Sequence, residues 1–215
     1  MKMVRLPILE KSMETKSFIR KQVLSLRNML SVSACEEKSS IIMQNILSLL
    51  PVQRAECVLC YASYKSEVQT KELIKELLKQ GKRVYLPKVS GEEMDFYKIN
   101  NLTDLTEGYK GIPEPSVKCT ELFTKALWEK DKERVVMILP GAAFSESGAR
   151  IGYGKGYYDR YLSHIPCMER IALCYEAQIV EEIPTDIHDI PMTMIVTEEK
   201  MRHINLRHEC KHIEI

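Results

Sequence analysis

The sequence predicts an α/β protein: a single three-layer domain in which a mostly parallel sheet carries helices on both faces. Three observations support this class. Short apolar runs, typical of buried strands, alternate along the chain with amphipathic helical segments. The length of 215 residues suits one such domain, which we expect to span residues 1–215. The composition, with 45% hydrophobic and 28% charged residues, is ordinary for a globular protein.

Strands are expected where short apolar runs are bounded by turn residues. These runs cover residues 57–63, 83–87, 93–99, 134–140, 169–175 and 192–197. The run RVVMILP at 134–140 is the strongest of them, because it is apolar almost throughout. Such continuous runs indicate strands that are buried on both faces of a parallel sheet.

Helices are expected between these runs. The helical segments cover residues 14–30, 33–50, 69–81 and a stretch that begins near Gly156. The apolar positions of the first are Phe18, Val23, Leu26 and Leu30. Ser33 is expected to cap the second, with Glu36 completing a capping box, and Pro51 to end it. Gly81 is expected to end the third. Residues 101–117, with two glycines and two prolines, are predicted to be a loop.

The charge balance bounds the partners of the chain. With 31 Lys and Arg against 30 Asp and Glu, the formal net charge is +1, so no global attraction to nucleic acid or to an anionic membrane is expected. No apolar run has the length of a membrane span, and the start of the chain does not resemble a signal peptide. Seven scattered cysteines favour reduced thiols and a cytoplasmic location. Cys57 and Cys60 should face opposite sides of a strand and pack in the core.

The most informative segment is PGAAFSESGARIGYGKGYYDRYL, residues 140–162, which holds five of the nine glycines. A buried strand, a glycine loop and a helix start form a common phosphate-binding arrangement, since backbone amides and the helix N-terminus attract anions. Lys155 in the loop and Arg150 at its beginning are expected to be largely solvent-facing and free to meet phosphate oxygens. The pattern is neither a Walker loop nor a dinucleotide fingerprint. A plain tight turn is the alternative.

The whole segment resembles the signature of the 5-formyltetrahydrofolate cyclo-ligase family, also called methenyltetrahydrofolate synthetase. That signature is a strand, Pro-Gly, a Phe, and then Gly-x-Arg-[Leu/Ile]-Gly-x-Gly-x-Gly-Tyr-Tyr-Asp. The matching residues are Pro140, Gly141, Phe144, Gly148, Arg150, Ile151, Gly152, Gly154, Gly156, Tyr157, Tyr158 and Asp159. Companion segments such as KSFIRKQVLSLRNMLS, YASYKSEVQT and GYKGIPEP follow in family order, so the resemblance covers about residues 16–198. Ser145 departs from the family, which commonly has an acid there, and the segment 199–215 matches nothing and is interpreted as a polar terminus.

The resemblance implies the NagB/RpiA/CoA transferase-like fold and an ATP- and Mg²⁺-dependent carbon–nitrogen cyclo-ligase, expected as a monomer. Its substrates would be 5-formyltetrahydrofolate and ATP, and its products 5,10-methenyltetrahydrofolate, ADP and phosphate. The γ-phosphoryl group would move to the formyl oxygen, after which folate nitrogen 10 attacks the formyl carbon and phosphate leaves. No protein nucleophile is required, so positioning and charge neutralisation would carry the catalysis.

The resemblance also implies roles for individual residues. The catalytic residues would be Arg150, Lys155 and Tyr158. The nucleotide-binding residues would be Lys16, Arg20, Arg150, Ile151, Gly152, Tyr153, Gly154, Lys155, Gly156, Tyr157 and Tyr158. The folate-binding residues would be Arg20, Ala62, Glu67, Tyr109 and Tyr153. Asp159 and Asp189 would hold Mg²⁺.

Plainer interpretations stay open for the same residues. Lys16 and Arg20 could be exposed helix cations, Glu67 a solvated loop acid, Asp159 a helix cap and Asp189 part of an Asx-turn. For the chain as a whole, the second hypothesis is a non-enzymatic relative of the same fold that binds nucleotide or RNA, and a sugar-phosphate isomerase-like activity is a weaker third. A degraded loop or missing carboxylates would favour the second hypothesis, and neither is visible.

Overall fold

The computed structural model describes residues 15–131, 134–165 and 168–205. Its helices are α1 (Lys16–Asn28), α2 (Val32–Ser48), α3 (Leu50–Arg54), α4 (Lys71–Lys79), α5 (Lys125–Asp131) and α6 (Tyr157–Ser163). Its strands are β1 (Cys57–Leu59), β2 (Arg83–Ser90), β3 (Glu93–Ile99), β4 (Leu105–Glu107), β5 (Pro113–Pro115), β6 (Val135–Leu139), β7 (Ala143–Ser145), β8 (Arg150–Ile151), β9 (Glu169–Leu173), β10 (Ile179–Val180), β11 (Met194–Val196) and β12 (Met201–His203).

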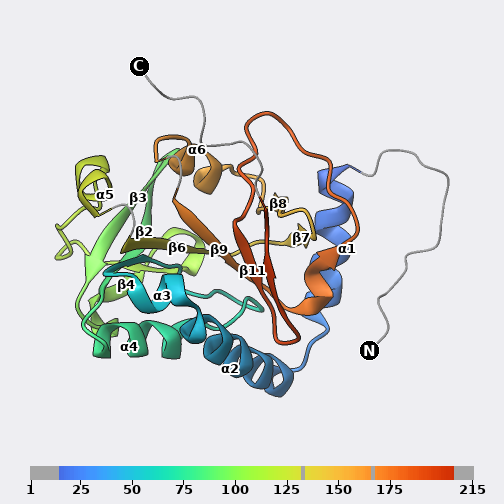
Figure 1. Ribbon diagram of the computed structural model, residues 1–215, viewed down its shortest axis with the longest axis horizontal. Coiled ribbons are helices and arrows are strands. Elements are labelled where there is room, and N and C mark those ends of the chain that lie inside the picture. Colours follow the sequence, from blue (N-terminus) through green and yellow to red (C-terminus); the bar gives the residue numbers. More distant parts are fainter. Residues whose placement is uncertain (1–14, 132–133, 166–167, 206–215) are drawn as a thin grey trace.

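A seven-stranded sheet forms the centre of the molecule, in the order β12-β11-β9-β6-β1-β2-β3 (Figure 1). The five strands from β11 to β2 run parallel, with Val58 of β1 opposite Val84 on one side and Val136 on the other. The two edge strands, β3 and β12, pair antiparallel with their neighbours. The prediction of a mostly parallel sheet is therefore confirmed.

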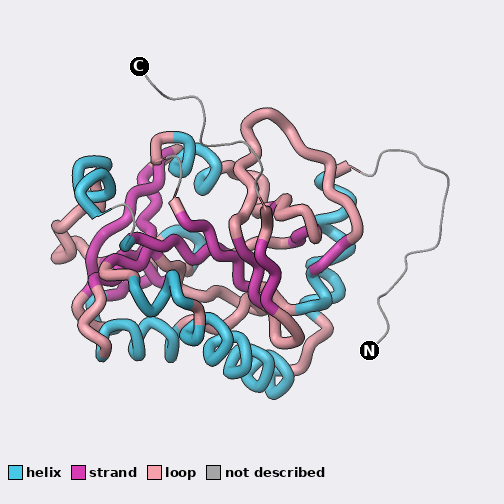
Figure 2. The backbone as a smooth tube through the Cα atoms, in the orientation of Figure 1, coloured by secondary structure: helices cyan, strands magenta, loops and turns pink. Residues whose placement is uncertain are grey.

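Helices cover both faces of this sheet, as Figure 2 shows. The alternation along β6 explains why two layers are needed: Val136 and Ile138 enter the core beneath α2 and α4, whereas Val135, Met137 and Leu139 enter the core beneath α5 and α6. Both faces of the central strands are thus apolar, and each must be covered to leave water. This arrangement confirms the predicted three-layer fold.

The two cysteines of the CxxC motif follow the same alternation. Cys57 lies in the core on the α5 and α6 side, Cys60 lies in the core on the α2 and α4 side, and neither side chain is exposed. The interpretation as core residues is confirmed, and burial raises the pKa of the Cys57 thiol to about 11. A thiol in that state is a poor nucleophile and metal ligand at neutral pH.

The first two helices differ from expectation in detail. The expected start of the first helix at residue 14 lies outside the described residues. Its buried positions are Ile19, Val23 and Arg27, whereas Phe18 and Leu26 are exposed, so the predicted apolar face is rotated. The second helix is capped by Ser31, whose side chain accepts from the Ala34 amide, and not by Ser33.

Two segments contain strands that the sequence did not predict. Within residues 101–117, β4 and β5 pair as a short antiparallel hairpin. In the tail, β12 adds an antiparallel edge to β11, while residues 206–215 lie outside the described residues. All three strands are three residues long, which is too short for an alternating pattern to be recognised.

A second, three-stranded sheet, β10-β7-β8, lies beside the main sheet and against α1. Ile19 and Val23 of α1 pack with Ala142, Ala143 and Ile151 in a small separate core. Ala142, Ala143 and Ile151 all belong to the glycine-rich segment 140–162, so α1 packs directly against that segment.

Gly148 is expected to be essential for the hairpin between β7 and β8. Its φ is +91°, and a Cβ placed there would lie 2.8 Å from the Met192 carbonyl oxygen. We expect Gly148→Ala to lower the free energy of unfolding by about 2–5 kcal/mol, because left-handed strain and a backbone clash add together. Gly81→Ala is the matched control, since Gly81 has φ +77° in open space and should lose only about 1–2 kcal/mol. Equal losses in urea denaturation would show that the Met192 contact is unimportant.

Candidate active site

The glycine-rich segment is not the single loop that the sequence predicted. Its first part folds back as the β7–β8 hairpin, with Gly148 in the turn. Only residues 152–156 form an open loop, in which Gly154 and Gly156 have positive φ values, and Gly156 precedes α6. The five glycines therefore serve two structures: a hairpin that docks α1 and a short loop that leads into α6.

Helix α1 carries two cations, of which Arg20 contacts this loop and Lys16 contacts the segment around residue 189. Arg20 donates from Nε to the Gly152 carbonyl oxygen at 2.8 Å, and its guanidinium lies close to Gly154. Lys16 forms ion pairs with Asp186, at 2.5 Å, and with Asp189. Burial lowers the pKa of Lys16, but the hydrogen bonds to the two aspartates outweigh it and raise the pKa above its ordinary value. Neither side chain is a free helix cation.

Glu67 joins the same cluster from the segment after β1. It is only 8% exposed, which rules out the solvated loop acid. Its carboxylate accepts from the Tyr153 hydroxyl at 2.5 Å and from the Tyr64 amide at 2.9 Å. Burial raises the pKa of Glu67, and these hydrogen bonds, together with the charge of Arg27, oppose that shift. Ala62, nearly buried, precedes this turn. Glu67 and Tyr153 are both expected to bind folate, and although they are 86 positions apart in the chain, they are joined by a hydrogen bond.

The expectation that Arg150 faces solvent is wrong. Its side chain is only 3% exposed, and Nη2 donates to both oxygens of Asp159, at 2.9 and 3.0 Å. Its guanidinium also lies 5.5 Å from the centre of the Tyr158 ring. Arg150 is buried because it belongs to β8 and not to the open loop. Burial raises the pKa of Tyr158 well above its ordinary value, so its phenol stays protonated at neutral pH.

Lys155, in contrast, is exposed as predicted. Its ammonium forms no hydrogen bond or ion pair with the residues that the structure describes, while its carbonyl oxygen accepts from Arg160 at 2.8 Å. Arg160 also donates to the Glu92 carbonyl oxygen, at 2.7 Å, and so ties the loop to the β2–β3 turn. Tyr157 stacks edge-on against Tyr109, with ring centres 6.3 Å apart. The expected residues of the 101–117 segment and of α6 are thereby brought into contact.

The two aspartates expected at a metal are each held by a cation, Asp159 by Arg150 and Asp189 by Lys16. Asp159 does not cap α6, since Gly156 occupies that position. Asp189 accepts from the Asp186 amide at 2.6 Å and so also stabilises its own turn. Across residues 15–131, 134–165 and 168–205, no three His, Cys, Asp or Glu side chains come together as a metal site. Each aspartate side chain is about one quarter exposed, so neither is closed off from solvent.

Sequence reasoning missed Arg27, which lies in the middle of the cluster. It donates from Nη1 to the Tyr153 hydroxyl at 2.9 Å and from Nε to the Ser66 hydroxyl at 3.0 Å. A signal was available: Arg27 follows Ile19 and Val23 at intervals of four, so it is a charge on the buried face of α1. The missed Arg160 carries no such signal, because it is an exposed cation on a short helix.

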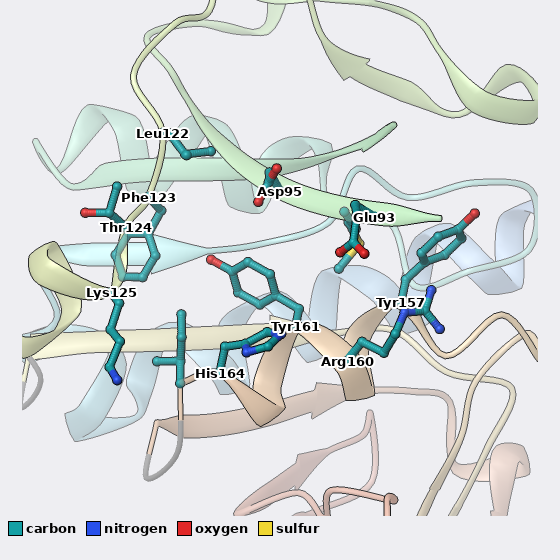
Figure 3. Close-up of a pocket in the computed structure, with 12 residues that line it drawn as sticks. Glu93, Asp95, Leu122, Phe123, Thr124, Lys125, Tyr157, Arg160, Tyr161 and His164 are labelled. Carbon is teal, nitrogen blue, oxygen red and sulfur yellow. The ribbon is translucent and has the colours of Figure 1, made fainter. Parts of the chain in front are cut away.

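A separate cavity of about 280 Å³ lies behind α6, between β3 and residues 122–125. Figure 3 shows Tyr157 and Arg160 at one end and Tyr161 near its middle. The lining of the cavity is mainly apolar and includes Phe123 and Ile165. Of the residues expected to bind nucleotide or folate, only Tyr157 lines this cavity. The cavity is therefore separate from the cluster that contains Glu67, Arg20 and Arg150.

Comparisons with known proteins identify the family of this chain. The profile of the 5-formyltetrahydrofolate cyclo-ligase family matches residues 12–198. The chain is 32% identical, over 77% of its length and 86% of the relative, to a probable 5-formyltetrahydrofolate cyclo-ligase of Schizosaccharomyces pombe. It is 31% identical to the 5-formyltetrahydrofolate cyclo-ligase of Escherichia coli K12, over 70% of this chain and 82% of that one.

The structure is also similar to solved ones. The NMR structure of Aquifex aeolicus 5,10-methenyltetrahydrofolate synthetase matches with a TM-score of 0.76 and 33% identity, covering 92% of this chain and 98% of that chain. The corresponding protein of Mycoplasma pneumoniae, at 24% identity and a TM-score of 0.67, has the same fold. With the signature segment, the profile match and the fold in agreement, this chain belongs to the 5-formyltetrahydrofolate cyclo-ligase family.

Proposed function

We propose that this chain converts 5-formyltetrahydrofolate and ATP, with Mg²⁺, into 5,10-methenyltetrahydrofolate, ADP and phosphate. One observation carries the proposal beyond family membership. Helix α1 brings Arg20 to the glycine loop, and the loop residue Tyr153 bonds Glu67, so the expected nucleotide and folate residues form one continuous cluster. Two substrates that must react with each other require adjacent sites.

The chemistry explains why this cluster needs cations and amides but no nucleophile. A formamide oxygen attacks the γ-phosphorus of ATP, the bond to ADP breaks, and an iminium phosphate forms. Folate nitrogen 10 then attacks the formyl carbon and loses its proton to solvent, the carbon–oxygen bond breaks, and phosphate leaves with the formyl oxygen. Negative charge grows on phosphoryl oxygens in the first step, so the free ammonium of Lys155 and the guanidinium of Arg20 are suited to stabilise it.

On the nucleotide side, we assign the phosphates to residues 151–156 and the first turn of α6. The amides of this open loop can approach an anion closely because Gly152, Gly154 and Gly156 have no side chains. Arg150 is buried and acts through its neighbours. Its guanidinium pairs with Asp159 and lies near the ring of Tyr158, so it orients these two residues. Tyr158, protonated at neutral pH, is able to donate a hydrogen bond.

On the folate side, we assign the pterin ring to Glu67, with Ala62, Tyr109 and Tyr153 around it. A pterin presents neighbouring N–H donors, and a carboxylate has two oxygens able to accept them. The oxygens of Glu67 each accept one protein hydrogen bond, which leaves further lone pairs for the ligand. Tyr153 has 48% of its surface exposed, so its ring offers an open aromatic face beside the carboxylate.

The residues present also fit Mg²⁺, which takes one or two carboxylates together with substrate phosphates and several waters. We assign it to Asp159 and Asp189, whose side chains are partly exposed and whose carboxylates have more acceptor sites than their partners Arg150 and Lys16 use. When bound, the ion would neutralise charge on the ATP phosphates.

For the remaining properties we propose a cytoplasmic monomer without nucleic-acid or membrane partners. The five cysteines of the described residues are all free, and four of them are buried. No helix among residues 15–131, 134–165 and 168–205 has the length and hydrophobicity of a membrane-spanning one. The near-neutral charge supports the absence of a nucleic-acid partner.

The activity itself is tested with purified protein, 5-formyltetrahydrofolate and Mg-ATP. We expect the near-ultraviolet absorbance of the methenyl product to rise, with one ADP released for each product. Both mono- and polyglutamylated substrates should be supplied, because the glutamate preference is open. Folded protein that forms no product from either would contradict the proposal, and nucleotide and RNA binding would then test the non-enzymatic alternative.

Lys155 and Arg150 are expected to differ when replaced by alanine. Lys155 is exposed and unpaired among the described residues, so Lys155→Ala should change the free energy of unfolding by no more than about 0.5 kcal/mol. It should nevertheless lower kcat/KM for ATP by tenfold or more, as loss of a charge-assisted contact of about 1.5–3 kcal/mol implies. Arg150→Ala should lower both the free energy of unfolding and kcat/KM for ATP, since it leaves Asp159 without its partner. Steady-state kinetics and thermal unfolding of both variants separate the two roles, and unchanged kinetics in Lys155→Ala would remove it from the site.

The metal assignment is tested by Asp159→Asn and Asp189→Asn. Each should raise the Mg²⁺ concentration that gives half-maximal rate, because an amide is a weaker ligand than a carboxylate. Asp186→Asn is the matched control: Asp186 also pairs with Lys16 but is assigned no metal, so its Mg²⁺ requirement should stay near that of the native chain. A variant with lower thermal stability and an unshifted Mg²⁺ requirement would show that its aspartate is structural.

A further inference from the structure

Arg27 is an unusual residue because it is a buried cation without a paired acid. Only 4% of it is exposed, and no carboxylate within residues 15–131, 134–165 and 168–205 forms an ion pair with it. Its hydrogen-bond acceptors are neutral: the Tyr153 hydroxyl, the Ser66 hydroxyl and, at 3.3 Å, the Gly141 carbonyl oxygen. A buried charge is costly unless an opposite charge compensates it, so its position calls for a nearby anion.

Glu67 is that anion, and one phenol separates it from Arg27. The Tyr153 hydroxyl lies 2.9 Å from Arg27 Nη1 and 2.5 Å from Glu67 Oε1. An arginine only donates hydrogen bonds and a carboxylate only accepts them. The Tyr153 hydroxyl must therefore accept from Arg27 and donate to Glu67, and it has no other orientation that satisfies both partners.

This relay constrains the geometry of the carboxylate and favours its charged form. The second oxygen of Glu67 is held by the Tyr64 amide, so the plane of the carboxylate is constrained at both ends. The positive charge of Arg27 opposes the rise in the pKa of Glu67 that burial causes. Arg27 itself is fixed through Ser66, whose hydroxyl donates to Asn28 at 2.5 Å.

We propose that Arg27 is a positioning residue of the folate site, which acts through Tyr153 to hold Glu67 for a flat heterocycle with neighbouring N–H donors. The assignment of the heterocycle rests on the proposed function. Arg27 does not touch the ligand in this scheme. It keeps the Tyr153 ring in place at the rim and leaves the outer lone pairs of the carboxylate for the ligand.

The test is equilibrium binding of 5-formyltetrahydrofolate in the absence of ATP, measured by titration calorimetry, beside binding of Mg-ATP. Arg27→Met and Tyr153→Phe should each weaken folate binding about tenfold, the amount expected for a hydrogen bond to a charged group. Nucleotide affinity should change less than about twofold, because residues 151–156 are assigned to the phosphates through their main-chain amides, which both substitutions keep. Arg27→Lys keeps the charge and one donor, so it should recover part of the loss. Lys21→Met, which removes an exposed cation from the same helix, is the matched control and should change neither affinity.

The double variant decides whether Arg27 acts through Tyr153. In the Tyr153→Phe background, Arg27→Met should weaken folate binding less than about twofold further, although it should still lower the melting temperature, because the Ser66 and Gly141 contacts are lost. Equal weakening in both backgrounds, or equal weakening of folate and nucleotide binding, would overturn the proposal. If Arg27→Met does not fold, the proposal is tested by Tyr153→Phe alone, and undiminished folate binding by that variant would overturn the proposal.

The same experiment separates this inference from the proposed activity. A chain that binds 5-formyltetrahydrofolate with the expected pattern but forms no methenyl product would retain the role of Arg27 and lose the proposed reaction. A chain that forms product while Arg27→Met and Tyr153→Phe bind folate normally would retain the reaction and lose the role of Arg27.

Discussion

The site depends on the packing of α1 against the small β10-β7-β8 sheet. Ile19 and Val23 fill a core whose other side consists largely of alanines, including Ala142 and Ala143, and these small residues let the helix approach closely. Once that contact is formed, Arg20, which follows Ile19 in the chain, lies against the glycine loop. Without it, the first helix and the glycine segment, more than a hundred residues apart, would have no reason to meet.

A second feature of the site is that several of its charges are compensated within the protein. Lys16 holds Asp189, Arg150 holds Asp159, and Arg27 is linked to Glu67 through a phenol. Side chains fixed in this way need little reorganisation when a ligand arrives, which is the condition for effective electrostatic stabilisation. The same pairing means that a metal or phosphate at these residues shares them with existing partners, so binding of ligand and rearrangement of the ion pairs are coupled.

Segments far apart in the sequence form the rim of the site. Tyr157 donates to the Gly91 carbonyl oxygen at 3.2 Å, and Arg160 bonds Glu92 and Lys155, so the β2–β3 turn, the glycine loop and α6 are held together. Tyr109 adds the 101–117 segment through its contact with Tyr157. The rim is thus fixed mainly by hydrogen bonds to main-chain oxygens, which depend on backbone position and not on the identity of the residues that supply them.

The sequence alone determined the fold class and the family resemblance, and from the resemblance it predicted which residues form the site. Apolar runs that alternate with helical segments define a parallel sheet with two covered faces, and the spacing of glycines, tyrosines and Asp159 resembles one family signature over its whole length. Only the tertiary structure decided the state of each side chain. Arg150 looks like a loop cation in sequence but is buried, because the β7–β8 hairpin that contains it packs on α1, more than a hundred residues away in the chain. Arg27 was not predicted as a site residue for the same reason. Its role depends on contacts with Tyr153 and, through it, Glu67, which lie 126 and 40 residues away in the chain and come within reach only when the helix is docked. Local patterns report periodicity and chain geometry, whereas burial and charge pairing are properties of contacts that exist only in the folded chain.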